Sequence, residues 1–281
     1  MPSHIEVAIR IRPFLNNELK SGHSQSRLKL EPGYKELLLR TKDNQVKSYR
    51  FDTILSEGAT QTKAYNELKM PYLVDRVFEG YQATVLTYGL TGSGKTYTMC
   101  GAEYSKSEAL TKDPCKHGLV QLCLDHFFKR KDDMLQDKGT ICKIYCSYYQ
   151  LYNEKIYDLL NCSANTAMQS LKLRWTKNDN FVVENLFVYE VKTKDGALNL
   201  FKLGNQNKIM ASHLLNMVSS RSHTIFTVIL ETSHTGGFDS IGSQMLFVDL
   251  AGSERFAYFQ DTSQSKKLIN EWYQHNQFGN Q

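Results

Sequence analysis

The residues with the clearest chemical signature form one glycine-rich segment. Its sequence is Gly89-Leu90-Thr91-Gly92-Ser93-Gly94-Lys95-Thr96, which satisfies GxxxxGK[ST] at every fixed position. This is the pattern of a phosphate-binding loop, in which glycines let backbone N–H groups curl around phosphate oxygens. A lysine ammonium then bridges the β- and γ-phosphates, and a hydroxyl binds Mg²⁺. We therefore predict that Lys95 holds the phosphates and that Thr96 is a metal ligand.

A loop of this kind needs a carboxylate from another strand to hold the metal. The apolar run Met245-Leu246-Phe247-Val248 leads into Asp249, and Asp249-Leu250-Ala251-Gly252 completes a DxxG pattern. In such a pattern the glycine N–H meets the γ-phosphate and moves when that phosphate is lost. We predict that Asp249 is a second metal ligand and that Gly252 senses the γ-phosphate.

The residues around these motifs must form the elements that position them. Alternating and short apolar runs predict strands over residues 4–12, 83–88, 140–152, 181–191, 224–231 and 245–250, with a small meander in 27–55. Helical spacing predicts helices over 61–79, with a kink at Pro71, and over 118–131 and 195–211. Residues 161–180 are predicted to form an exposed loop. The alternation of strand and helix predicts an α/β fold with a mostly parallel central sheet and helices on both faces.

The composition is that of a single folded domain. Of the 281 residues, 41% are hydrophobic, enough to bury a large core. The net charge of +5 is far below that of a dedicated nucleic-acid-binding protein, so we expect no nucleic-acid partner. No apolar run reaches the length of a membrane span and the N-terminus has no signal-peptide pattern, so we expect a cytoplasmic protein without membrane insertion. The six cysteines form no CxxC pair and are predicted to be buried free thiols.

A GTPase is the alternative that the DxxG pattern raises. It would need an [NT]KxD guanine motif, and Thr176-Lys177-Asn178-Asp179 matches that pattern. The match precedes Asp249 in the chain, whereas a guanine motif belongs on a strand after DxxG. We therefore interpret residues 176–179 as a polar turn.

Three segments resemble the kinesin motor domain, and they follow one another in the order of that family. Residues 87–99 match the kinesin phosphate loop nearly letter for letter. Residues 216–223 carry the switch I pattern NxxSSRSH, and residues 249–255 carry the switch II pattern DLAGSER. The resemblance covers residues 4 to about 255. It implies a P-loop NTPase of the kinesin motor type that binds ATP and Mg²⁺, hydrolyses ATP, and has microtubules as its partner and its location.

The resemblance also implies which residues contact the nucleotide. Arg12, Pro13 and Tyr97 would line the adenine pocket, with the Tyr97 ring stacked on the base. The loop residues Gly89 to Thr96 would surround the phosphates. Leu90 replaces the glutamine that most kinesins have at this variable position, and we expect the site to tolerate it.

Two switch segments are implied to complete the site. Ser219 and Ser220 would approach Mg²⁺ and the γ-phosphate when switch I closes, with Ser219 as a further metal ligand. Arg221 and Glu254 would form an ion pair that latches switch I to switch II and helps to position the attacking water. For His223 a structural role in holding the loop is at least as well supported as a chemical one.

The resemblance weakens after Arg255. The next residues, 256–260, lack the family's glycine-containing loop, and its INxSL motif survives only in part. We therefore expect one motor domain over residues 1–281 that is incomplete at its C-terminus, with a divergent tail in 256–281. Weak motor function and no encoded dimerisation follow from this expectation. The alternative is a non-motile nucleotide-binding or microtubule-associated protein derived from a kinesin.

Overall fold

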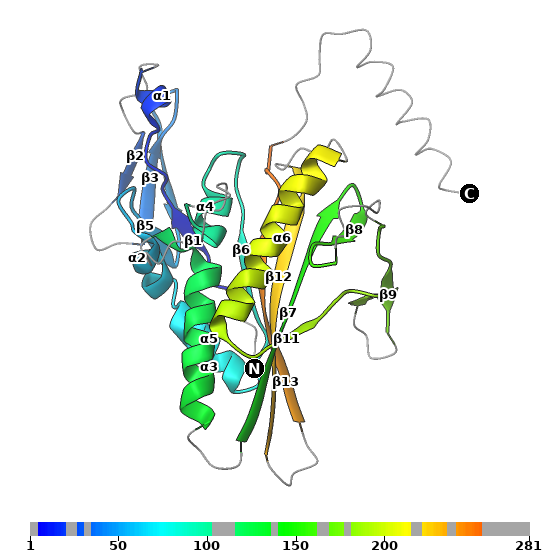
Figure 1. Ribbon diagram of the computed structural model, residues 1–281. Coiled ribbons are helices and arrows are strands. Elements are labelled where there is room, and N and C mark those ends of the chain that lie inside the picture. Colours follow the sequence, from blue (N-terminus) through cyan, green and yellow to red (C-terminus); the bar gives the residue numbers. More distant parts are fainter. Residues whose placement is uncertain are drawn as a thin grey trace.

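The computed structural model of the chain describes residues 5–20, 27–30, 35–102, 116–135, 140–161, 169–176, 181–214, 221–234 and 240–254. Figure 1 shows a central sheet crossed by two long helices, with a small sheet on one side and a hairpin on the other. The strands are β1 (Ala8–Arg10), β2 (Leu28–Leu30), β3 (Glu36–Arg40), β4 (Val46–Arg50), β5 (Thr53–Leu55), β6 (Ala83–Thr87), β7 (Thr140–Tyr152), β8 (Lys155–Asp158), β9 (Leu173–Trp175), β10 (Phe181–Val183), β11 (Tyr189–Val191), β12 (His223–His234) and β13 (Ser240–Asp249). The helices are α1 (Asn16–Lys20), α2 (Gln61–Glu67), α3 (Met70–Phe78), α4 (Lys95–Cys100), α5 (Leu119–Leu135) and α6 (Lys194–Leu214).

The central sheet has the strand order β11-β7-β12-β13-β6, with β8 paired to β7. Among the described pairs of this sheet, β13 and β6 run parallel and the others run antiparallel. The prediction of a mostly parallel sheet is therefore wrong. The reason lies in the connections: residues 235–239 between β12 and β13, and Asn153-Glu154 between β7 and β8, are too few for the crossover that parallel neighbours need.

One face of the sheet carries a layer made of α3, α5 and α6, with α4 beside them. Five aromatic side chains at most 2% exposed fill the space between the layers: Phe127, Tyr148, Phe201, Phe226 and Phe247. The rings of Tyr148, Phe201 and Phe226 lie with their centroids 5.0 to 5.6 Å apart. Burying one large apolar side chain contributes about 2 kcal/mol, so this cluster fixes the helices on the sheet.

The opposite face of the sheet is covered less completely. Leu86 is 57% exposed there, and Leu246 and Val248 are partly exposed. In the part of the chain that the structure describes, the helices that pack on the central sheet all lie on the first face. The prediction of helices on both faces is not met within those residues. None of the described helices combines the length and the apolar character needed to cross a bilayer.

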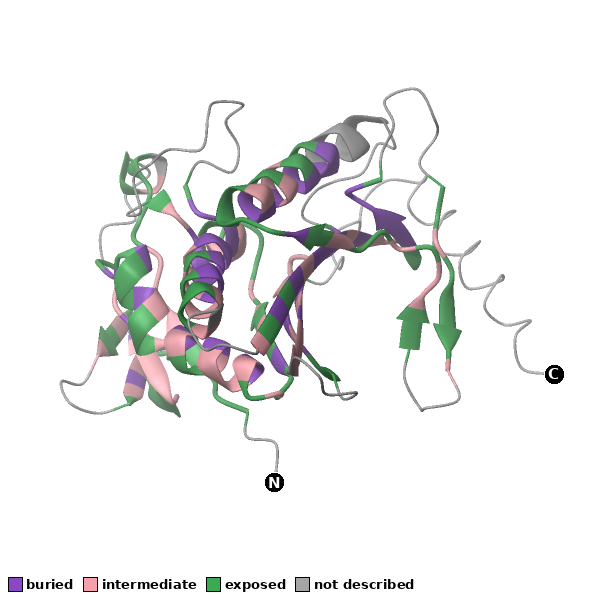
Figure 2. Ribbon diagram, turned by 60° about the horizontal axis from the view of Figure 1, so that its bottom comes forward, coloured by how far each residue is buried: buried purple, intermediate pink, exposed green. Residues whose placement is uncertain are grey.

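The remaining elements confirm some predictions and correct others. The meander predicted in residues 27–55 is the antiparallel sheet β2-β3-β4, followed by β5, which pairs with β1. The helix predicted over 61–79 is divided into α2 and α3, because Lys69 adopts a left-handed φ of 55° and Pro71 lies in the first turn of α3. The loop predicted over 161–180 contains β9, so that prediction is wrong at this strand. Figure 2 shows its hairpin with β10 as a mostly exposed arm.

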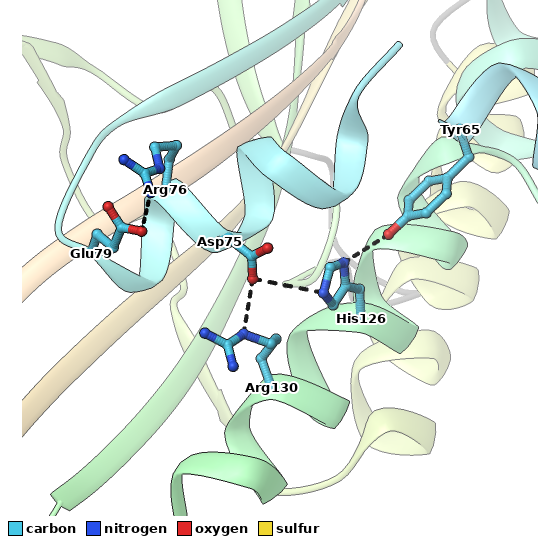
Figure 3. Close-up of polar contacts among 6 residues, drawn as sticks. All are labelled: Tyr65, Asp75, Arg76, Glu79, His126 and Arg130. Atoms are coloured by element: carbon cyan, nitrogen blue, oxygen red, sulfur yellow. Dashed lines mark hydrogen bonds and ion pairs between the residues drawn. The ribbon is translucent and has the colours of Figure 1, made fainter. Parts of the chain in front are cut away.

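Polar contacts join α2, α3 and α5. Asp75 Oδ1 lies 2.8 Å from Arg130 Nε and 3.8 Å from His126 Nε2, and the Tyr65 hydroxyl lies 2.9 Å from His126 Nδ1 (Figure 3). We call these four residues the Asp75 cluster. Burial lowers the pKa of His126, against the opposing effect of the Asp75 carboxylate. Of the two neutral tautomers of the ring, the one with its proton on Nε2 directs that proton toward Asp75 and lets Nδ1 accept from the Tyr65 hydroxyl.

The cysteines follow the prediction wherever they are described. Cys100, Cys123, Cys142 and Cys146 are buried free thiols. Burial raises the pKa of each thiol, to about 12 for Cys146, which keeps these side chains protonated and unreactive at neutral pH. Cys115 and Cys162 lie outside the described residues.

Candidate nucleotide-binding site

The glycine-rich segment connects β6 to α4, the strand and the helix that its pattern requires. Gly92 and Gly94 have left-handed backbone conformations with φ of 77° and 99°, which residues with a Cβ rarely adopt. They turn the chain so that the Ser93 N–H donates to the Leu90 carbonyl over 3.1 Å and α4 begins at Lys95. The predicted succession of strand, loop and helix is confirmed.

The Lys95 side chain folds back over the loop. Its Nζ donates to the carbonyl oxygens of Gly89 and Leu90, both over 2.9 Å. The ammonium thus lies within the curl of the backbone, where a phosphate-binding lysine must act. Phosphate oxygens are charged acceptors and bind an ammonium more strongly than neutral carbonyl oxygens do. Lys95 can therefore exchange these two carbonyl contacts for phosphate contacts.

Thr96, in the first turn of α4, and Asp249, the last residue of β13, are in contact. Because β13 runs parallel to β6 with Asp249 opposite Thr87, its carboxylate reaches the start of α4. The Thr96 hydroxyl donates to Asp249 Oδ2 over 2.7 Å, and the Thr87 hydroxyl donates to Oδ1 over 3.2 Å. Asp249 is 4% exposed, so a buried carboxylate lies directly below the loop.

This set of donors fits Mg²⁺. The ion prefers oxygen ligands at about 2.1 Å and binds through one or two protein groups together with phosphates and water. Neighbouring ligands of one such ion are roughly 3 Å apart, close to the separation between Thr96 Oγ1 and Asp249 Oδ2. No group of three or more His, Cys, Asp or Glu side chains gathers anywhere in the described ranges. A metal at this place would thus take most of its ligands from phosphate and water.

Lys208, which the sequence analysis did not single out, lies beside this carboxylate. Lys208 Nζ of α6 lies 3.6 Å from Asp249 Oδ2, and the two side chains are 8% and 5% exposed. A pair buried this deeply is weakly screened by solvent. The available signal was helical spacing, because Lys208 follows the buried Phe201 and Gly204 by seven and four residues and so shares their helix face. A lysine on a buried face requires a charged partner.

The segment after Asp249 returns to the loop. The Ser253 N–H donates to the Gly89 carbonyl over 3.0 Å, and Glu254 accepts hydrogen bonds from both the N–H and the hydroxyl of Thr91. These bonds lower the pKa of Glu254, with Lys95 adding to the effect. A Cβ at Gly252 would collide with the Glu254 carboxylate, so the glycine leaves room for this contact. The predicted ion pair of Glu254 with Arg221 stays a prediction.

Switch I is described only at its end. Ser219 and Ser220 lie outside the described residues, so their roles stay predictions. Arg221 is exposed, and the next strand, β12, starts at His223. His223 Nδ1 accepts a hydrogen bond from the Ala251 N–H over 3.1 Å. This contact ties the start of β12 to the DxxG segment and supports a structural role for His223.

The role of Arg12, Pro13 and Tyr97 around the adenine stays a prediction, and the structure shows the surroundings of each. Arg12 forms an ion pair with Glu18 over 2.6 Å, and Pro13 is exposed. Tyr97 lies on α4 and is 46% exposed, which leaves part of its ring accessible. The guanidinium next to that ring belongs to Arg10, 5.2 Å from its centroid. The sequence analysis gave Arg10 no role.

Comparisons with known proteins bear on this geometry. A family model of the kinesin motor domain matches residues 10–277. This chain belongs to the kinesin motor domain family. Human kinesin-like protein KIF7 is 36% identical over 261 residues, covering 89% of this chain and 18% of the relative. Kinesin-like protein KLP1 of Chlamydomonas reinhardtii is 35% identical over 275 residues, covering 94% of this chain and 33% of the relative.

Comparison with solved structures bears on the fold of this chain. One described as a fast kinesin matches with a TM-score of 0.81 and 26% identity, over 95% of this chain and 71% of that chain. The predicted α/β fold of the kinesin motor type is confirmed. Kinesin motor domains bind nucleotide with Mg²⁺ and are microtubule-based motors. The present chain spans at most about a third of the length of KIF7 and KLP1. The family match continues past Arg255, and the predicted division at residue 256 stays a prediction.

Proposed function

We propose that this chain binds MgATP and hydrolyses it, and that microtubules stimulate the reaction. The observation that supports this most directly is the contact between the Thr96 hydroxyl and the buried Asp249 carboxylate, beside the Lys95 ammonium. A hydroxyl, a carboxylate and a lysine around a glycine-rich turn are the groups that hold the phosphates and metal of a nucleoside triphosphate. Membership of the kinesin motor domain family supports ATP as the nucleotide and microtubules as the partner.

Hydrolysis would proceed by in-line attack of water on the γ-phosphate. Lys95 and the loop N–H groups would stabilise the negative charge that spreads over the phosphate oxygens. Mg²⁺, held by Thr96 and Asp249, would neutralise charge on the β- and γ-phosphates when bound. Gly252 would sense the γ-phosphate through its N–H. Ser219, Ser220 and the Arg221–Glu254 pair would close the site and position water, as the kinesin resemblance implies.

Steady-state ATP hydrolysis with and without microtubules tests this function. We expect turnover that rises when microtubules are added, and a loss of about 100-fold or more in Lys95→Ala. Lys63→Ala is a matched control, because Lys63 is an exposed lysine of α2 paired with Glu67. Turnover that ignores microtubules would overturn the motor assignment. Equal turnover in Lys95→Ala and the unmodified chain would overturn the nucleotide site itself.

A nucleotide-binding protein without useful turnover is the second candidate. The contact of Glu254 with Thr91 favours it, because this carboxylate is engaged by the loop in the described structure. Tight MgATP binding without hydrolysis, with or without microtubules, would support this candidate over the motor.

A GTPase is disfavoured by the structure around the [NT]KxD match. Residue 176 follows β9, and residues 177–179 lie outside the described residues. Among the residues that the structure describes, β9 pairs with β10 in a two-stranded sheet apart from the central one. A guanine motif belongs at the end of a strand in the central sheet, next to the nucleotide. Weaker binding of GTP than of ATP is the expected result. The opposite preference would contradict the assignment of ATP.

A further inference from the structure

The strand β4 is exposed along its whole length at one edge of the antiparallel sheet β2-β3-β4. It has β3 on one side and, within the described residues, no strand on the other. All 5 of its residues are exposed, Val46 to 59% and Tyr49 to 44%. Figure 1 shows this sheet at one side of the molecule, apart from the central sheet. An edge of this kind presents unpaired backbone groups to which another strand can bond.

The register of β4 decides which of its backbone groups face outward. Before the strand, the Thr41 N–H donates to the Gln45 carbonyl over 2.8 Å. After it, the Phe51 N–H donates to the Lys35 carbonyl over 2.9 Å. In an antiparallel pair, residues bonded to the neighbouring strand alternate with residues whose N–H and C=O groups point away. The odd-numbered residues from 45 to 51 therefore face β3. The residues whose backbone groups point to the open side are Val46, Ser48 and Arg50.

The side chains of β4 place a cation on both faces of this open edge. Side chains alternate between the two faces of a strand, so Lys47 and Tyr49 project to one face. Val46 and Arg50 project to the other. Each face thus offers one cation and one exposed apolar or aromatic side chain to a strand that would lie beside β4.

The hairpin of β3 and β4 is basic as a whole. Over residues 36–50 its cationic residues outnumber its acidic ones: Arg40, Lys42, Lys47 and Arg50 against Glu36 and Asp43. The Glu36 carboxylate already accepts a hydrogen bond from the Ser48 hydroxyl. Neither Lys47 nor Arg50 forms an ion pair with a described carboxylate. This charge favours an acidic partner and disfavours a second copy of the chain, which would bring the same charge.

We propose that β4 is a docking edge for an extended acidic segment of another protein, which adds to the sheet as a further strand. Hydrogen bonds from the outward backbone groups of β4 hold the segment, and its carboxylates pair with Lys47 and Arg50. In strand addition of this kind the main chain supplies the affinity and the alternating side chains supply the specificity. The docking edge does not depend on nucleotide binding, so its failure would leave the proposed function untouched.

Two synthetic peptides test the charge of the partner. A peptide of four Glu-Thr-Val repeats has glutamates three residues apart, which therefore alternate between the two faces of a strand. A peptide of four Lys-Thr-Val repeats has the same spacing and the opposite charge. Fluorescence anisotropy should show binding of the glutamate peptide and at least about tenfold weaker binding of the lysine peptide. An unmodified chain that binds neither peptide, or both equally, would overturn the proposal.

Residue-resolved amide hydrogen exchange tests strand addition itself. With the glutamate peptide bound, the N–H groups of Val46, Ser48 and Arg50 should exchange at least about tenfold more slowly, because they become hydrogen-bonded. Lys47 and Tyr49 already face β3 and are controls on the same strand, with an expected change of less than about twofold. Peptide binding that leaves the three outward N–H groups unprotected would overturn strand addition.

Ser48→Pro removes the central outward donor. Proline is tolerated on an edge strand where the missing N–H would face solvent, so the chain should stay folded, which circular dichroism checks. The variant should bind the glutamate peptide at least about tenfold more weakly. Ser48→Ala is the matched control, because it loses the same hydroxyl contact with Glu36 but keeps the N–H. Equal affinity of these two variants would contradict the docking edge.

A charge reversal provides a variant that leaves the backbone donors in place. Lys47→Glu should reduce the preference for the glutamate over the lysine peptide at least about fivefold. Lys63→Glu, on the exposed face of α2, is the control and should preserve that preference. An unchanged preference in Lys47→Glu would overturn the proposed charge pairing. Self-association of the unmodified chain that Ser48→Pro abolishes would show a second copy at this edge, against the acidic partner.

Discussion

Asp249 and Asp75 each lie close to a cationic side chain and to a further polar side chain, but Asp249 is buried and Asp75 is partly exposed. Asp249 accepts from Thr96 and Thr87 and has the Lys208 ammonium 3.6 Å away. Asp75 lies 2.8 Å from the Arg130 guanidinium and next to His126. The side chain of Asp249 is 5% exposed, whereas that of Asp75 is 39% exposed. Each carboxylate thus combines a cation with a second polar group.

The two aspartates differ in burial and in the element that they face, and we infer that this difference separates a ligand site from an ordinary polar contact. Asp249 ends a strand whose neighbour leads into a glycine-rich turn, so its buried carboxylate faces a loop with accessible backbone. Asp75 lies within α3, and its contacts run sideways to α5. Removing a buried charge partner has a large energetic effect, whereas an exposed ion pair contributes little. The Asp75 cluster should therefore serve packing alone.

The largest expected effect comes from removing the cation beside Asp249. Lys208→Met should lower the free energy of unfolding by about 3 kcal/mol in the absence of metal, because Asp249 keeps its buried charge without its lysine neighbour. Urea unfolding followed by circular dichroism measures this change. The matched variant at the other aspartate, Arg130→Met, should cost at most about 1 kcal/mol. Equal losses of unfolding free energy in the two variants would contradict the distinction between a buried Asp249 pair and a partly exposed Asp75 pair.

The second effect concerns the metal. Asp249→Asn should weaken ATP binding in Mg²⁺ by about 100-fold, since a neutral amide oxygen is a poor ligand for this ion, and should largely abolish the difference between Mg²⁺ and EDTA. Calorimetric titration with ATP in each solution measures it. Asp75→Asn is the control and should leave both affinities unchanged. An Asp249→Asn variant with undiminished dependence on Mg²⁺ would contradict the assignment.

The sequence predicted that Thr96 and Asp249 lie together, as the structure shows, but it did not predict the groups around them. The glycine-rich segment and DxxG place their residues by local spacing, and the strands β6 and β13 that bring Thr96 and Asp249 together have clear apolar runs. Helical spacing indicates that Lys208 lies on a buried helix face and needs a charged partner, but that partner, Asp249, lies far along the chain, so the local pattern did not identify it. The mostly parallel sheet was predicted because alternating strands and helices usually indicate crossovers. The short connection 235–239 instead makes β12 and β13 a hairpin.

A smaller effect should appear in the pH dependence of the Asp75 cluster. Burial lowers the pKa of His126 in the folded chain, so the unfolded chain binds more protons between that pKa and the ordinary value of about 6.5. The free energy of unfolding should therefore fall as the pH drops below about 6.5. His126→Gln should make this dependence shallower in urea unfolding at pH 5 to 7.5. A dependence just as steep in that variant would exclude His126 as its source.

The smallest effect is expected for the hydroxyl beside this histidine. Tyr65→Phe removes the hydrogen bond between the Tyr65 hydroxyl and His126 Nδ1 and should lower the free energy of unfolding by about 1 kcal/mol. Thermal unfolding measures the change, and ATP affinity should stay constant. A loss of ATP affinity would show that the Asp75 cluster affects the nucleotide site, and would contradict the assignment of the cluster to packing alone.

The central claim is that Thr96 and Asp249 bind one metal ion together with the nucleotide, and a change of metal tests it most directly. In Thr96→Cys a thiol replaces the hydroxyl, and sulfur prefers Cd²⁺ to Mg²⁺. The variant should bind ATP at least about tenfold more weakly than the unmodified chain in Mg²⁺ and should recover most of that loss in Cd²⁺. The unmodified chain supplies the reference in both metals, including any effect of its own cysteines. An equal loss of affinity in Mg²⁺ and Cd²⁺ would contradict the account, because the side chain at position 96 would then not touch the metal.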